Sequence, residues 1–248
     1  MPGAPAFVDL HCHTSASFDS LASPEAVVRA AIARGLTHLA ITDHDRISGA
    51  LEARDVAARL AREQGDRGDA GEPLVVLVGE EIKSRDGDLI GVFLTDAVPP
   101  GLSAAETIAA IHEQGGLAGI PHPFDRARPT SLSRSSAEPS TLEAMAGRVD
   151  WIEAWNARVM LGNGNQRAAD LALAAGVPGV AVSDAHTVME VGVAATVVTG
   201  DPGTAAGLRE ALSGERRLVT GRGSAYARLV TPAAKVVQRL RGRGRVPA

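Results

Sequence analysis

Residues 7–19 read FVDLHCHTSASFD, and two histidines stand at the end of its apolar run. An apolar run of this kind is typical of a buried strand, and His11 and His13 follow it directly. Successive residues of a strand point to opposite faces, so these two imidazoles share one face while Cys12 turns away. Asp19 follows six residues after the second histidine and offers a carboxylate. A strand that ends in imidazoles and a carboxylate predicts a metal site at that end.

Short β-rich runs alternate with Ala-rich stretches along most of the chain. We expect seven strands, at residues 6–11, 37–42, 74–81, 117–122, 150–155, 179–184 and 194–199. Such alternation predicts a parallel sheet, and the scarcity of aromatic residues, at 3%, fits a core of Val, Leu, Ile and Ala. Seven strands with ionisable residues at their ends favour a closed, TIM-like α/β barrel over an open sheet, with the active site at the C-terminal ends of the strands.

The length of 248 residues favours one domain, and we expect a barrel over residues 1–232 followed by a basic, frayed tail over 233–248. The single cysteine excludes an internal disulfide and fits a reducing compartment. The first residues do not form a signal peptide, and no apolar run approaches the roughly 20 residues of a membrane span. We therefore expect a cytoplasmic protein with no membrane partner.

Charge is distributed unevenly along the chain. The formal net charge is −4, yet residues 216–248 hold nine Lys and Arg and no acidic residue. A basic tail on an acidic body indicates either a nucleic-acid-binding arm or a solvated chain end. The last ten residues, RLRGRGRVPA, lack the aromatic side chains that stack on bases, which favours the solvated end.

Possible metal ligands recur at the expected C-terminal ends of the strands. They are His11, His13, Asp19, His44, Glu80, Glu81, His122, Asp184 and His186. In a barrel these ends meet on one side, where active sites are built. Imidazole together with carboxylate suits Zn, Mn or Fe better than Mg or Ca. The set is too large for one ion, so we expect two or three divalent ions.

The chain carries six motifs that resemble those of the polymerase and histidinol phosphatase (PHP) family. In order they are DLHCHTS (9–15), FDS (18–20), ITDHD (41–45), GEEI (79–82), PHPFD (121–125) and SDAH (183–186). The resemblance runs from residue 9 to about residue 198. It implies a distorted barrel of seven strands, a centre of two or three metals, and hydrolysis of a phosphoester.

The resemblance also implies a distribution of ligands. It assigns His11, His13 and Asp184 to the first metal, Glu81 to a bridge with the second, His122 to the second, and Asp19, His44 and His186 to the third. Many relatives carry a further histidine after the bridging glutamate, and Asp88 falls at that place here. We expect Asp88 to bind the second metal, where an oxygen ligand favours Mn or Fe over Zn.

The expected chemistry follows from charge. Two cations that share Glu81 also share a water, and their field lowers the pKa of that water enough to form hydroxide near neutral pH. We expect Glu81, His122 and Asp184 to be the catalytic ligands around this bridging hydroxide. A one-residue shift of the strand would exchange Glu81 with Glu80.

Three cationic side chains are candidates for binding the substrate phosphate. The family resemblance favours Arg126 and Arg158, and Lys83 lies just past the bridging glutamate. Arginine offers a planar fork for phosphate oxygens, but a salt bridge or a solvated charge explains each of the three equally well. The Ser- and Arg-containing segment 125–140 is either a mobile lid or a disordered loop.

The sequence leaves the substrate open. Candidates are a phosphomonoester of a nucleotide or another small metabolite, and the end of a nucleic acid. One alternative is a histidinol phosphate phosphatase, and another is a non-catalytic domain that binds metal or a protein partner. Two further histidines, His38 and His112, lie away from the strand ends and are expected to be structural.

Overall fold

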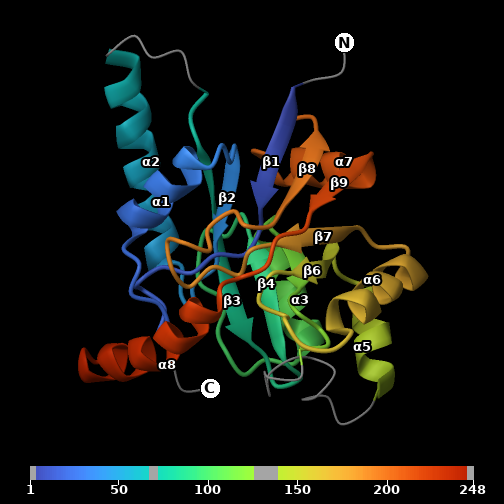
Figure 1. Ribbon diagram of the computed structural model, residues 1–248. Coiled ribbons are helices and arrows are strands. Elements are labelled where there is room, and N and C mark those ends of the chain that lie inside the picture. The colour runs from blue at the N-terminus through green and yellow to red at the C-terminus, as the bar shows by residue number, and fades with distance from the viewer. Residues whose placement is uncertain (1–3, 67–71, 126–138, 245–248) are drawn as a thin grey trace.

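The computed structural model describes residues 4–66, 72–125 and 139–244, and within them nine strands form one sheet (Figure 1). The strands are β1 Pro5–Asp9, β2 His38–Ile41, β3 Val75–Lys83, β4 Asp88–Val92, β5 Leu117–Ile120, β6 Trp151–Asn156, β7 Gly179–Val182, β8 Ala195–Thr199 and β9 Arg216–Val219. The helices are α1 Pro24–Ala33, α2 Ser48–Asp66, α3 Ala104–Glu113, α5 Pro139–Ala146, α6 Gly164–Ala175, α7 Ala205–Ser213 and α8 Ala225–Leu240. The order of strands in the sheet is β7-β6-β5-β4-β3-β2-β1-β8-β9.

The α/β barrel class is confirmed, whereas the strand count of seven is wrong because β4 and β9 were not anticipated. β4 forms an antiparallel hairpin with β3 through a turn at residues 84–87, where Gly87 has a φ of 141°. The four-residue β9 pairs antiparallel with β8 and has two exposed arginines, so it lacks the apolar signature of a strand. β8 itself runs antiparallel to β1, since no crossover helix separates it from β7.

The barrel closes where the first strand meets the seventh. Beyond β1, Cys12 bridges Ala185 in parallel, and the backbone N–H of Asp184 donates to the carbonyl of His11 at 2.9 Å. Nearby, the hydroxyl of Thr196 on β8 accepts from the N–H of Ala181 at 2.8 Å. Closure therefore carries the SDAH segment to the side of the HCH segment, although about 170 residues separate them in the sequence.

The barrel has an inner and an outer apolar core. The outer core lies between the sheet and the helices and includes Val27 and Val28 of α1. The inner core fills the barrel, with Trp151 fully buried in it. Gly119 on the neighbouring strand is required there, because a Cβ atom at that position would lie 2.1 Å from the indole ring. A filled barrel confines the polar side chains to one end.

The C-terminal segment differs from the frayed tail expected over residues 233–248. The predicted boundary at residue 232 falls inside α8, which continues to Leu240, and Gln238 on this helix is fully buried. In Figure 1 the arrowheads of β1 and β3 point down, toward the end of the molecule where α8 lies. Residues 245–248 lie outside the described part of the chain. None of the helices in the described residues has both the length and the apolar character needed to cross a membrane.

Candidate metal centre at the C-terminal end of the barrel

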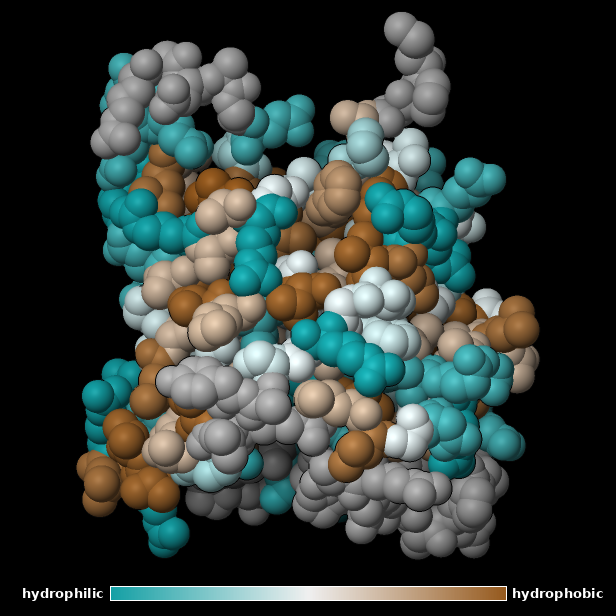
Figure 2. All heavy atoms as spheres, in the orientation of Figure 1, coloured by the Kyte–Doolittle hydropathy of each residue, from teal (hydrophilic) through white to brown (hydrophobic). Residues whose placement is uncertain are grey.

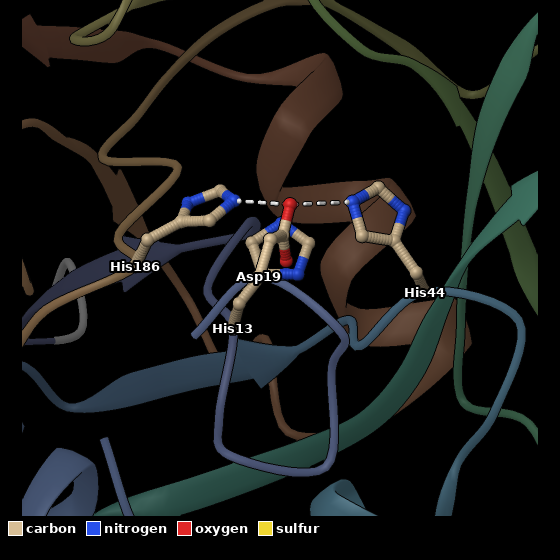
Figure 3. Close-up of side chains that lie close together, drawn as sticks. All are labelled: His13, Asp19, His44 and His186. Atoms are coloured by element: carbon tan, nitrogen blue, oxygen red, sulfur yellow. Dashed lines mark hydrogen bonds and ion pairs between the residues drawn. The ribbon is translucent and has the colours of Figure 1, made fainter. Parts of the chain in front are cut away.

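A first group of four buried side chains consists of Asp19 and three histidines around it, His13, His44 and His186 (Figure 3). The carboxylate oxygen Oδ2 of Asp19 lies 3.1 Å from Nε2 of His186 and 3.3 Å from Nε2 of His44. Figure 3 shows the carboxylate between these two imidazoles, with His13 beside it. The sequence grouped three of these residues in the third site, and the structure adds His13 to them.

Two further groups adjoin the first. The structure brings together His11, His13 and Asp184 in one, and His11, Glu81 and His122 in the other. Oε1 of Glu81 lies 3.1 Å from Nε2 of His122, and its Oε2 lies 3.3 Å from Nε2 of both His11 and His13. Because members are shared, the three groups form one continuous cluster.

The donor atoms of this cluster suit divalent ions. Nε2 of His11 and Nε2 of His13 face each other at 2.9 Å. Oε2 of Glu81 accepts no hydrogen bond from the described residues, yet Nδ1 of His44 lies 3.2 Å away from it. Buried polar atoms in proteins are nearly always hydrogen-bonded, and metal ligands are a recognised exception. Converging imidazole nitrogens and carboxylate oxygens are the ligand set of Zn, Mn or Fe.

The carboxylates raise the proton affinity of two imidazoles. Burial lowers the pKa of His11, but Asp184 and Glu153 outweigh burial and hold it well above its ordinary value. Burial likewise lowers the pKa of His13, but the nearby carboxylates of Asp184 and Glu81 raise it to about 9. The cluster therefore attracts positive charge strongly.

Other members stay in the form that binds a metal. Burial would raise the pKa of Asp19 and of Glu81, but neighbouring histidines, His44 among them, hold both pKa values well below the ordinary range. Burial and the charge of Arg158 lower the pKa of His186 to about 3. Ionised carboxylates and a neutral imidazole are the protonation states that metal coordination needs.

Two residues that sequence reasoning missed orient the ligands. Oε1 of Glu153 lies 2.6 Å from Nδ1 of His11, and Oε2 accepts from the backbone N–H of His122 at 2.8 Å. Nδ2 of Asn156 donates to the same Glu153 and to Oδ2 of Asp184, at 2.8 and 2.9 Å. A register shift in β6 after Glu153 accompanies this arrangement. An acidic residue inside the apolar strand DWIEAW was the available signal.

Backbone conformation also directs the ligands. Two of the expected ligands, His122 and Asp184, have positive φ values of 27° and 51°. Positive φ is unfavourable for residues with a Cβ atom, and such residues concentrate at functional sites. Each residue is the second one after the end of a short strand, so the change of direction occurs where the side chains enter the cluster.

The remaining candidates lie less centrally. Asp88 is buried at the start of β4, opposite Lys83, and belongs to none of the three groups found in the described residues. Its role as a ligand stays a prediction. Lys83 is half-buried, and its backbone N–H donates to Asp45. Glu80 accepts from the N–H of Val98 at 2.8 Å and is outside these groups too. Arg126 lies outside the described residues.

Arg158 is buried beside the cluster. Its Nη1 lies 3.3 Å from Oε2 of Glu190, and its Nη2 donates to Oγ1 of Thr231 at 3.1 Å. Glu190 also accepts from the backbone N–H of His186 at 3.1 Å. The guanidinium is therefore held next to the residues of the first group, where the sequence expected a phosphate ligand.

The structure is thus a filled α/β barrel with a candidate metal centre, a buried cluster of histidines and carboxylates, at the C-terminal ends of its strands. The model of the PHP domain matches residues 9–120, and the model of the PHP-associated region matches residues 162–216. An uncharacterised protein of Methanocaldococcus jannaschii is 38% identical over 126 residues, which cover 47% of this chain and 67% of that protein. The chain belongs to the PHP family.

Two other relatives illustrate the range of the family. A 5′-3′ exoribonuclease of Haemophilus influenzae is 30% identical over 132 residues, covering 48% of this chain and 43% of that enzyme. The crystal structure of a two-domain Bacteroides vulgatus protein, described as containing a predicted PHP-like metal-dependent phosphoesterase, has a TM-score of 0.63. It is 22% identical, and the likeness covers 88% of this chain and 65% of that one. The matched regions thus span about half to two thirds of these proteins.

Proposed function

We propose that this protein is a divalent-metal-dependent phosphoesterase whose active site is the cluster around Glu81. The observation that carries the proposal is the convergence of three ligand groups on shared side chains, with Glu81, His11 and His13 linking them. Such sharing suits adjacent ions that act on one substrate. The proposed ions are Mn, Zn or Fe, two or three of them.

The side chains of the cluster are arranged for ligation. Nδ1 of His11 donates to Glu153 and Nδ1 of His186 donates to the carbonyl of Asp184, so both rings present Nε2 to the site. Ions held there would polarise phosphoryl oxygens and lower the pKa of water. Arg158, fixed by Glu190, is placed to bind a phosphate oxygen of the substrate. The catalytic roles of Glu81, His122 and Asp184 are part of this proposal.

We infer that the substrate is a phosphomonoester of a nucleotide or other small metabolite, or the end of a nucleic acid. The likeness to an enzyme named 5′-3′ exoribonuclease supports the nucleotide and nucleic-acid options. The cluster side chains are buried, which favours a substrate whose phosphate is terminal, because a terminal phosphate can approach them without the rest of the substrate.

A substrate panel tests the proposal. Protein freed of metal with a chelator is reloaded with Mn²⁺, Zn²⁺ or Mg²⁺ and incubated with phosphomonoesters, histidinol phosphate, nucleoside 3′,5′-bisphosphates and short labelled RNA and DNA. We expect release of phosphate or of a nucleotide with Mn²⁺ from at least one class, and loss of this activity in Asp19→Ala. An exposed carboxylate on α3, changed in Glu113→Gln, is the matched control. Absence of turnover with every substrate and metal would overturn the proposal.

A further inference from the structure

A glutamine near the end of α8 is completely buried, although the helix lies at the surface of the protein. Nε2 of Gln238 lies 2.7 Å from the carbonyl oxygen of Ser15, 3.0 Å from that of Ser17 and 2.7 Å from that of Ser20. An amide NH₂ group has two protons, so two of these carbonyls are bonded at a time. All three carbonyls belong to the loop between β1 and α1.

This loop carries Asp19, the carboxylate at the centre of the first group. The loop has no helix or strand of its own, and polar contacts fix its shape. Ser17 donates to Oδ1 of Asp19 at 2.7 Å, and Ser20 donates to the carbonyl of His186 at 2.9 Å. Nη1 of Arg243, beyond α8, donates to the carbonyl of Ser15 at 2.9 Å. The end of the chain thus supplies donors that the loop itself lacks.

The same face of α8 reaches the arginine of the site. Thr231 bonds to Arg158 and lies two helical turns before Gln238, so the two side chains project from one face. Among the residues of α8 whose side chains the structure describes, Ala227 and Ala234 are also buried, and Val230 and Val237 are half-buried. Polar contacts therefore act together with apolar ones in the docking of α8.

The opposite face of α8 is open to solvent. Val236 and Leu240 are 61% and 83% exposed, and Figure 2 shows hydrophobic side chains on this part of the surface. The reddish helix behind the four side chains of Figure 3 is α8, which passes close to the cluster. The described contacts of the helix with the rest of the protein thus include the loop that carries Asp19.

We propose that Gln238 is a positioning residue for the ion held by the Asp19 group, acting through the carbonyls of the 15–20 loop. The proposal rests on the proposed function in one respect, namely that this group binds a divalent ion. Loss of the amide leaves buried carbonyls without donors, and the loop shifts to regain water. Asp19 lies within the 15–20 loop and moves with it. His11 comes directly after β1, before residue 15, and Glu81 and His122 belong to β3 and to the segment after β5, so we expect these three to shift less.

The test measures Mn²⁺ binding alone, by calorimetry on chelator-treated protein, with thermal unfolding recorded in the absence of metal. Gln238→Leu removes the donors and keeps the volume, and Gln166→Leu, at an exposed position of α6, is the matched control. Asp19→Asn identifies which class of Mn²⁺ sites belongs to the Asp19 group. We expect Gln238→Leu to weaken that class about 10- to 100-fold, the range found when a partner that orients a ligand is lost, and to leave the other class within about 2-fold.

The outcomes separate this inference from the proposed function. Native protein that binds no Mn²⁺ overturns both. Native protein that binds Mn²⁺, with Gln238→Leu equal to native or weakened equally in every class, overturns the positioning role alone. If Gln238→Leu does not fold, Arg243→Ala decides, because this exposed residue bonds to the same loop. It should weaken the same class about 2- to 5-fold, as loss of one hydrogen bond does, and unchanged binding overturns the proposal.

Discussion

Replacing Glu81 by glutamine should weaken metal binding and so reduce the stability that the protein gains from bound metal. The carboxylate lies within 3.1 to 3.3 Å of nitrogens from His11, His13, His44 and His122, so it touches every imidazole of the cluster except that of His186. Glutamine has nearly the same shape but no negative charge. Loss of a residue that merely orients a ligand costs about 10- to 100-fold in metal affinity, so loss of this charge should cost about 100-fold, or about 2.8 kcal/mol.

Thermal unfolding with and without Mn²⁺ measures this loss of affinity as a smaller change in Tm. At a metal concentration of about 100 times Kd, binding stabilises the native protein by about 2.7 kcal/mol. A chain of this length gains about 2–4 °C per kcal/mol, so Mn²⁺ should raise its Tm by about 5–11 °C. With Kd raised 100-fold, the same concentration stabilises Glu81→Gln by only about 0.4 kcal/mol, or about 1–2 °C. Each protein is compared with itself, so changes in metal-free stability cancel.

Glu113→Gln serves as the control, because it removes the same charge from an exposed position of α3. This variant should keep the full Mn²⁺-dependent rise in Tm. If Mn²⁺ raises the Tm of Glu81→Gln as much as that of native protein, the reasoning is refuted. Such a result would mean that metal binding does not need the Glu81 carboxylate. Turnover of the substrate found by the panel should fall at least about 100-fold in Glu81→Gln.

Three other substitutions have defined consequences. Glu153→Gln should reduce activity about 10- to 100-fold at a fixed Mn²⁺ concentration, because the ring of His11 loses its charged partner. Higher Mn²⁺ concentrations should restore part of this activity, and activity equal to native would contradict the prediction. Arg158→Ala should raise KM for the substrate about tenfold, as loss of a charged hydrogen bond to phosphate does, and unchanged kinetics would remove this residue from the site. Burial lowers the pKa of His38, so below about pH 6.5 the unfolded state binds the proton more readily and stability falls. Between pH 7.5 and 5.5 the Tm of His38→Gln should therefore fall less than that of native protein. An equal fall in both would contradict the role of His38 in this pH dependence.

The gathering of the candidate ligands at one end of the barrel could be anticipated because each motif is local, whereas their division into groups was implied by the family resemblance. His11 and His13 lie in one strand end, and Asp184 and His186 in another, so periodicity alone indicates which side chains share a face. Parallel strands then place separate motifs at one end of a barrel. The sequence could not reveal that His13 stands in two groups at once, since this depends on how closely the strand ends approach.

The supporting residues depend on tertiary contacts that no local pattern encodes. Glu153 contacts His11 at a point where the register of β6 shifts, and such a shift cannot be read from the sequence. Gln238 lies in a segment whose composition is basic and polar, and composition of that kind predicts a solvated end. The segment docks in part because one of its polar side chains meets the carbonyls of three residues in the 15–20 loop. β4 was missed although the polar turn SRDG (84–87) between two apolar runs is a hairpin signal that the sequence does carry.

The most direct test of a metal-dependent active site is anomalous diffraction, at the manganese absorption edge, from crystals of this protein grown with Mn²⁺. The account predicts at least two strong peaks, one among His13, Asp19, His44 and His186, and another beside Glu81. Glu81→Gln crystals should lose the second peak. A map without peaks in the cluster, or with peaks only at exposed carboxylates, would contradict the account.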